Sequence, residues 1–136
     1  MSEDLYKEII LDYYKNPRNY GTLENPDIKA MDSNPLCGDE LEMQLKLGDP
    51  DKIADIRFNG KGCAISMASA SILTELVQGK NIDTARNMAK EELLGAMGTP
   101  NLGPVRIKCA LLSLKVLKLA IYSHLGKKLE GEDANL

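Results

Sequence analysis

Three cysteines are the residues of this chain best suited to bind a soft metal ion or to carry sulfur. Cys37 lies in a loop before a predicted strand, Cys63 at a junction from strand to helix, and Cys109 near the start of a predicted helix. Helix N-termini favour a thiolate over a thiol, which applies to the second and third cysteines. Glycines flank Cys37 and Cys63, so their sulfur atoms should be little shielded.

A buried structural role is the alternative for each cysteine taken alone, because free cysteine is among the most buried residue types. Several features together favour a thiolate metal site. The three cysteines lie near turns that contain glycine or proline, Asp39 follows the first of them, and positive charge lies nearby on Lys61, Arg106 and Lys108. The absence of a Cys-x-x-Cys pair excludes zinc-ribbon and ferredoxin patterns. The residues thus predict a site of three cysteines completed by Asp39.

The other candidate residues give weaker signals. His124, the only histidine, lies late in the last predicted helix and is interpreted as a solvated or helix-end residue. A nucleophilic pair of a cysteine with His124 stays open. The fragment Gly60-x-Gly62 lacks the remaining elements of a phosphate loop. The methionines are interpreted as core fillers, namely Met43, Met67, Met88 and Met97.

Composition limits the classes of protein to consider. The chain has 136 residues, 43% of them hydrophobic and 27% charged, and we expect one domain over residues 1–136. A net charge of −3 and few aromatic residues argue against nucleic-acid binding. Lysines interrupt the most apolar stretch, 107–125, so we expect a core helix and no membrane contact. Without a visible targeting signal, a cytoplasmic location is expected.

The elements that must position the cysteines follow from hydrophobic periodicity. Alternation predicts a strand over 41–47 and a second with Ala54, Ile56 and Phe58 on its inner face, joined by a turn at 48–51. A weaker strand is expected over 27–32. Helices are predicted over 3–15, over 64–78, twice within 82–97, and from Pro104 onward as a long C-terminal helix. The order indicates an α+β class, and the polar tail from Gly126 is expected to fray.

Four motifs occur in order along nearly the whole chain: Asn16-Pro-Arg-Asn-Tyr-Gly21, Asn34-Pro-Leu-Cys-Gly-Asp39, Gly60-Lys-Gly-Cys-Ala-Ile-Ser66 and Val105-Arg-Ile-Lys-Cys109. Together they resemble the IscU/NifU-type iron–sulfur cluster assembly scaffold family, which includes SufU. The resemblance implies an α+β fold in which a three-stranded antiparallel sheet packs against several helices. It also implies that the three cysteine loops gather at one end.

The resemblance further implies a function. Cys37, Asp39, Cys63 and Cys109 would hold a [2Fe-2S] cluster, or Zn²⁺ at the same site. The family builds the cluster from iron and from persulfide sulfur supplied by a cysteine desulfurase, and passes it to apo iron–sulfur proteins. Cys109 and Cys37 are our candidate persulfide acceptors. The chain would then be a scaffold and sulfur acceptor rather than a turnover enzyme, and a homodimer sharing the cluster stays open.

Two departures from the family pattern leave alternatives open. Lys108 stands where the best-known IscU proteins have a histidine, so Asp39 is the obvious fourth ligand. Lys108 and Arg106 are more similar to SufU, which makes a zinc-dependent sulfurtransferase the alternative function. SufU proteins, however, carry an insertion that the interval 63–109 looks too short to hold. A structural zinc site is a third interpretation. The segment Leu102-Gly-Pro-Val-Arg106 differs at two positions from the one that a specialised chaperone recognises, which puts a chaperone partner in doubt.

Overall fold

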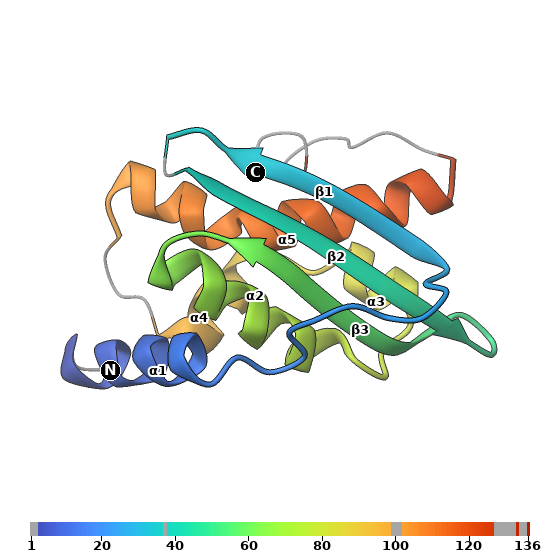
Figure 1. The fold of residues 1–136 in the computed structure, drawn as a ribbon, viewed down its shortest axis with the longest axis horizontal. Helices are drawn as coiled ribbons and strands as arrows, with labels where there is room; N and C mark the ends of the chain where they lie inside the picture. Colours follow the sequence, from blue (N-terminus) through green and yellow to red (C-terminus); the bar gives the residue numbers. More distant parts are fainter. Residues whose placement is uncertain (1–2, 37, 99–101, 127–132, 134–135) are drawn as a thin grey trace.

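The fold is a three-stranded antiparallel sheet packed against helices, in the strand order β1-β2-β3 (Figure 1). The computed structural model describes residues 3–36, 38–98, 102–126, 133 and 136. The strands are β1 (Ile28–Asn34), β2 (Asp39–Gly48) and β3 (Lys52–Lys61). The helices are α1 (Glu3–Lys15), α2 (Ala64–Val77), α3 (Ile82–Arg86), α4 (Lys90–Met97) and α5 (Pro104–His124). The predicted α+β class, three-stranded sheet and long last helix are confirmed.

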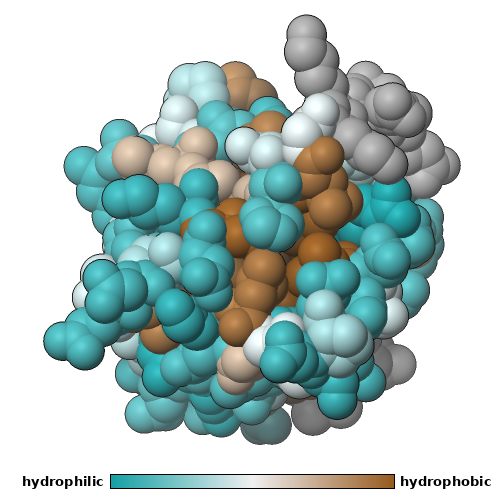
Figure 2. Space-filling model, turned by 90° about the vertical axis from the view of Figure 1, so that its right-hand side faces the viewer, coloured by the Kyte–Doolittle hydropathy of each residue, from teal (hydrophilic) through white to brown (hydrophobic). Residues whose placement is uncertain are grey.

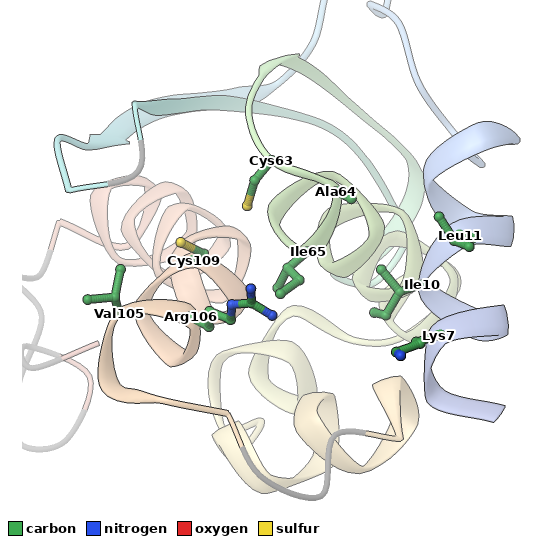
Figure 3. Close-up of a pocket in the computed structure, with 9 residues that line it drawn as sticks. All are labelled: Lys7, Ile10, Leu11, Cys63, Ala64, Ile65, Val105, Arg106 and Cys109. Carbon is green, nitrogen blue, oxygen red and sulfur yellow. The ribbon is translucent and has the colours of Figure 1, made fainter. Parts of the chain in front are cut away.

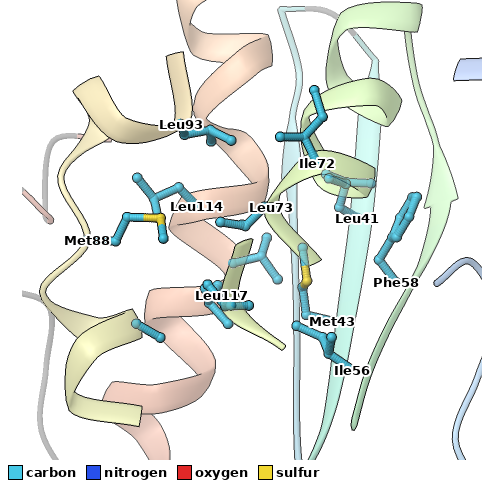
Figure 4. Packing of buried hydrophobic residues seen from close by; sticks show 14 of the residues in the cluster. Leu41, Met43, Ile56, Phe58, Ile72, Leu73, Met88, Leu93, Leu114 and Leu117 are labelled. Carbon is cyan, nitrogen blue, oxygen red and sulfur yellow. The ribbon is translucent and has the colours of Figure 1, made fainter. Parts of the chain in front are cut away.

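The helices cover one face of the sheet. Helices α2 and α5 contact the strands and each other, α1 packs against α2, and α3 and α4 contact α5. In the central strand Leu41, Met43 and Leu45 alternate with polar residues and are fully buried. Figure 4 shows two of them facing side chains of α2, with side chains of α5 nearby. Met43, Met88 and Met97 are buried and Met67 packs against the core, so the methionines are core residues as predicted.

The inner face of β3 differs from the predicted one. Ile56 and Phe58 are fully buried as expected, but Ala54 is exposed and Ile53 takes the buried position. The cause is a register shift: Lys46 pairs with Asp55 and Leu47 with Ile53, so Ala54 is an extra residue. One extra residue in a strand reverses which side chains face inward, because the side-chain period is two.

Helix α5 is buried around much of its circumference. Pro104 occupies its first turn as predicted, and the helix carries one nearly buried cation, Lys118, whose exposure is 4%. Lys118 Nζ lies 2.6 Å from Asp133 Oδ1, and the Tyr122 hydroxyl donates to Asp133 Oδ2 at 2.9 Å. A buried cation needs such a partner. This part of the tail is therefore held against α5, contrary to the expectation that the tail frays; residues 127–132, 134 and 135 lie outside the described part.

The two ends of the fold differ. The start of β2, the end of β3 and the starts of α2 and α5 lie at the left-hand end of Figure 1. The opposite end, in Figure 2, is mostly hydrophilic around a narrow apolar strip. In the ranges that the structure describes, every helix is too short or too polar to cross a membrane.

The register shift can be tested with two neighbouring substitutions. Ile53→Ala removes a fully buried side chain and should lower the free energy of unfolding by about 2–5 kcal/mol. Ala54→Ser changes an exposed residue and should alter it by less than about 0.5 kcal/mol. Urea unfolding with a shared m-value measures both. The reverse order of effects would mean that the strand keeps the simple alternation.

Candidate metal centre

Three segments that are distant in the sequence meet at the end of the fold that lies on the left in Figure 1. Asp39 is the first residue of β2, Cys63 joins β3 to α2, and Cys109 lies in the second turn of α5. Their ligand atoms all lie within 4.8 Å of one another. Two sulfurs and a carboxylate oxygen this close are a donor set suited to zinc or iron. Cys37, the fourth residue expected here, lies outside the described residues.

The turn at Cys63 is held by backbone hydrogen bonds. The Cys63 amide donates to Asp39 Oδ1 at 2.8 Å, and Asp39 is fully buried. Cys63 is also the N-cap of α2, where its sulfur accepts a hydrogen bond from the Ser66 amide at 3.4 Å. The sulfur thus takes the place of the oxygen acceptor usual at helix starts. It lies 3.8 Å from Asp39 Oδ2.

Two glycines make this turn sterically feasible. Gly60 has φ +136°, and a Cβ there would collide with the carbonyl oxygen of Glu40. At Gly62 a Cβ would lie 2.6 Å from Asp39 Oδ1. The close approach of the turn to the Asp39 carboxylate therefore depends on the missing side chain at Gly62. The sequence showed both glycines beside Cys63, but not this contact.

Cys109 is buried, with 2% exposure, and its sulfur is near a residue that the sequence analysis did not single out. Asn34 Nδ2 donates to Cys109 Sγ at 3.9 Å, and Asn34 Oδ1 accepts from the Leu36 amide at 3.1 Å. Asn34 thus connects α5 to the loop that precedes Cys37. Asn34 is the first residue of the family motif that contains Cys37, and this position was the signal in the sequence that could have identified it. Cys63 is a free thiol, whereas Cys109 is disulfide-bonded in the structure and offers a thiolate after reduction.

An open cavity of about 670 Å³ borders the two sulfurs. Figure 3 shows the Cys63 and Cys109 sulfurs on neighbouring elements, with α1 forming the opposite wall. The walls are mainly apolar, and the lining residues are Lys7, Ile10, Leu11, Cys63, Ala64, Ile65, Val105, Arg106 and Cys109. Leu11 and Val105 are about half exposed. The sequence predicted the helix over 3–15, but its place in the wall of this cavity depends on how α1 packs against α2.

The predicted positive residues lie at different sides of the site. Arg106 is exposed and lines the cavity with Cys63 and Cys109. Lys108 is exposed and lines a smaller cavity on the side of the loop before Cys37. Lys61 is exposed at the end of β3. The three positive residues therefore come from two elements, Arg106 and Lys108 from α5 and Lys61 from β3.

His124 does not belong to this site. It is exposed and is the last residue of α5, at the opposite end of that helix from Cys109. Fifteen residues of α-helix span about 22 Å, which is far beyond hydrogen-bond reach. A Cys109–His124 nucleophilic pair is therefore wrong, and the interpretation of His124 as a helix-end residue is confirmed.

The fold and donor set define a class of protein, and comparison with known sequences identifies it. The chain belongs to the family of NifU-like N-terminal domains, whose family model matches residues 5–131. It is 39% identical to the zinc-dependent sulfurtransferase SufU of Bacillus subtilis (strain 168), covering 91% of this chain and 94% of that protein. It is 36% identical to the iron–sulfur cluster assembly scaffold protein IscU of Escherichia coli (strain K12), with 90% and 96% covered.

Solved structures give the same result. The crystal structure of FiSufU from Fervidobacterium islandicum AW-1 superposes with a TM-score of 0.71 at 33% identity, covering 89% of this chain and 99% of that one. The NifU-like protein (N-terminal) from Brucella abortus gives a TM-score of 0.73 at 26% identity, with 93% and 98% covered. The predicted resemblance to the IscU/NifU-type family is thus confirmed.

The Gly62 contact leads to a prediction about metal binding. Gly62→Ala should force the turn away from Asp39, lower the free energy of unfolding by about 1–3 kcal/mol and weaken Co²⁺ binding about tenfold. The thiolate-to-cobalt absorption bands report the binding. Gly95→Ala is the matched control, because a Cβ there meets nothing within 4 Å, and it should leave binding unchanged. Equal cobalt affinity in both variants would contradict the steric argument.

Proposed function

We propose that this chain is a scaffold on which a [2Fe-2S] cluster is assembled from iron and from desulfurase-derived persulfide sulfur, and from which the cluster passes to apo-proteins. The observation that carries the proposal is the group formed by Asp39, Cys63 and Cys109, with ligand atoms within 4.8 Å beside an open cavity. The relationship to IscU, named an assembly scaffold protein, supports it.

The ligand set suits a cluster that must be both held and released. We assign Cys37, Asp39, Cys63 and Cys109 as the ligands. Thiolates are soft and bind iron–sulfur clusters tightly. The Asp39 carboxylate is a harder and poorer match, so it should weaken the hold on the cluster. In this role the chain is a carrier rather than a turnover enzyme, and the cluster is its cargo.

The proposed partners follow from this cycle. A cysteine desulfurase would deliver sulfur at the cysteine end, next to α1, and apo iron–sulfur proteins would receive the cluster there. Metal binding by the cysteines needs them reduced, which suits a reducing compartment, and for this we propose the cytoplasm. A chaperone is not among the proposed partners, because the segment Leu102-Gly-Pro-Val-Arg106 differs at two positions from the one that the chaperone recognises.

A zinc-dependent sulfurtransferase is the second candidate. The 39% identity to a protein of that name favours it, as do Lys108 and Arg106. Zn²⁺ would take the same tetrahedral donor set. The alignment to SufU is 140 positions long, more than the 136 residues of this chain, so SufU contains residues that this chain lacks. The interval 63–109 of this chain, which looks too short for the insertion of SufU proteins, favours the scaffold.

Anaerobic reconstitution separates the candidates. The reduced protein is incubated with iron and sulfide, and its visible spectrum, iron, sulfide and zinc contents are measured. The scaffold predicts charge-transfer bands and two iron atoms per site. A colourless protein that keeps one zinc and excludes iron would favour the sulfurtransferase. A structural zinc site predicts, in addition, that the metal-free chain unfolds.

Removing the carboxylate should slow cluster release. Asp39→Ala is expected to slow transfer to an apo-acceptor about tenfold, followed by the visible circular dichroism of the acceptor. Asp39→Asn is the matched control for folding, because its amide oxygen can still accept from the Cys63 amide while the charge is lost. Both variants should slow transfer. Transfer at the original rate or faster in both would show that Asp39 does not promote release.

The sulfur acceptor can be identified by mass spectrometry of single cysteine-to-serine variants after reaction with a persulfide donor. We expect the adduct on Cys109 or Cys37. Sulfur acceptance needs an accessible thiolate, and Cys109 is 2% exposed, so its labelling would require the site to open. An adduct confined to Cys63 would refute the assignment.

A further inference from the structure

The loop 16–21, one of the four family motifs, has no role in the ligand set described so far. It follows α1 and runs along the outer edge of β3. The Phe58 amide donates to the Asn19 carbonyl at 3.0 Å, and the Gly21 amide donates to the Phe58 carbonyl at 2.9 Å. The loop therefore supplies backbone partners to an edge that β2 does not cover.

Gly60 lies two residues after Phe58, so its backbone groups face the same edge. At this position the partner is a side chain: the Tyr20 hydroxyl donates to the Gly60 carbonyl at 3.2 Å. The Tyr20 ring packs edge-on against Phe58, with centroids 5.2 Å apart at an interplanar angle of 90°. Phe58 is fully buried, so the Tyr20 ring packs against a residue of the core. The residue that Tyr20 bonds, Gly60, lies three positions before Cys63.

The same loop also holds the helix on the other side of Cys63. The Arg18 amide donates to Ser71 Oγ at 2.7 Å, and Asn19 Nδ2 donates to Thr74 Oγ1 at 3.0 Å. Ser71 and Thr74 are fully buried on α2. The loop is thus bonded to the strand before Cys63 and to the helix after it. Movement of β3 relative to α2 would change the position of the Cys63 sulfur, because Cys63 joins these two elements.

We propose that Tyr20 is a positioning residue for the metal centre. Its bond to the Gly60 carbonyl holds the end of β3, so that the Cys63 amide stays on Asp39 and the Cys63 sulfur stays within reach of Cys109. The proposal rests on the proposed function for its role in cluster retention. The hydroxyl touches neither sulfur, so it acts through the backbone of the turn.

Tyr20→Phe tests the proposal, because it removes the hydroxyl and keeps the ring on Phe58. After anaerobic reconstitution, the variant should lose its cluster to a chelator roughly twofold to fivefold faster than the unaltered protein, as expected for one lost, partly solvated hydrogen bond. The visible circular dichroism of the cluster should also change, while the far-ultraviolet spectrum stays the same. Tyr14→Phe is the matched control: Tyr14 lies on α1, is 45% exposed, and should give no change.

A second measurement does not need the cluster. In the reduced metal-free protein, the rate at which iodoacetamide alkylates Cys63 is followed by peptide mass spectrometry. Tyr20→Phe should raise this rate roughly twofold to fivefold, and Tyr14→Phe should not. Rates equal to those of the unaltered protein in both assays would overturn the positioning role and leave the proposed function intact. If the unaltered protein also fails to bind a cluster, the proposed function fails, and the alkylation rate alone decides the role of Tyr20.

Discussion

The hydrogen bond from the Cys63 amide to the Asp39 carboxylate is the contact on which the candidate site depends. A carboxylate with no exposure to water is costly unless it is hydrogen-bonded, and the backbone amide supplies such a bond. The bond joins the first residue of β2 to the turn between β3 and α2. It also requires Gly62, since a side chain there would lie against the carboxylate. One polar contact thus sets the strand end, the turn and the start of the helix.

The packing of the core then places Cys109, the third candidate ligand, beside this turn. Helix α5 packs on β1, β2 and α2, and its buried residues fix how far its first turns extend beyond the sheet. Cys109 lies in those turns and is nearly buried, whereas Cys63 is partly exposed on the cavity beside α1. The result is a site with a buried inner side and an open outer side. Such an arrangement suits a group that is assembled in place and then given to another protein.

Local patterns predicted what depends on neighbouring residues. The alternation in 41–47 and the helical spacing in 64–78 gave elements close to β2 and α2. The junction at Cys63 followed from the second strand, predicted with Ile56 and Phe58 on its inner face, and from the helix after it. The missed features depend on contacts between distant segments. Ala54 faces outward because β3 gains a residue relative to β2, and Asn34 meets Cys109 only after α5 packs on the sheet. Lys118 is buried because Asp133 returns to it. A pattern of neighbouring residues does not predict which distant residues come into contact.

The two oxygens of Asp39 have different partners, and this affects how many of them a metal could use. Oδ1 accepts from the Cys63 amide, so Oδ2, which lies 3.8 Å from the Cys63 sulfur, is the oxygen that would be available to hold a metal. Asp39 would therefore offer a metal one oxygen more readily than two. Monodentate carboxylate ligation keeps the coordination number low and suits the tetrahedral shells of zinc and of iron in clusters. The larger oxygen shells of calcium, which often take both oxygens of a carboxylate, are disfavoured at this site by the same backbone contact.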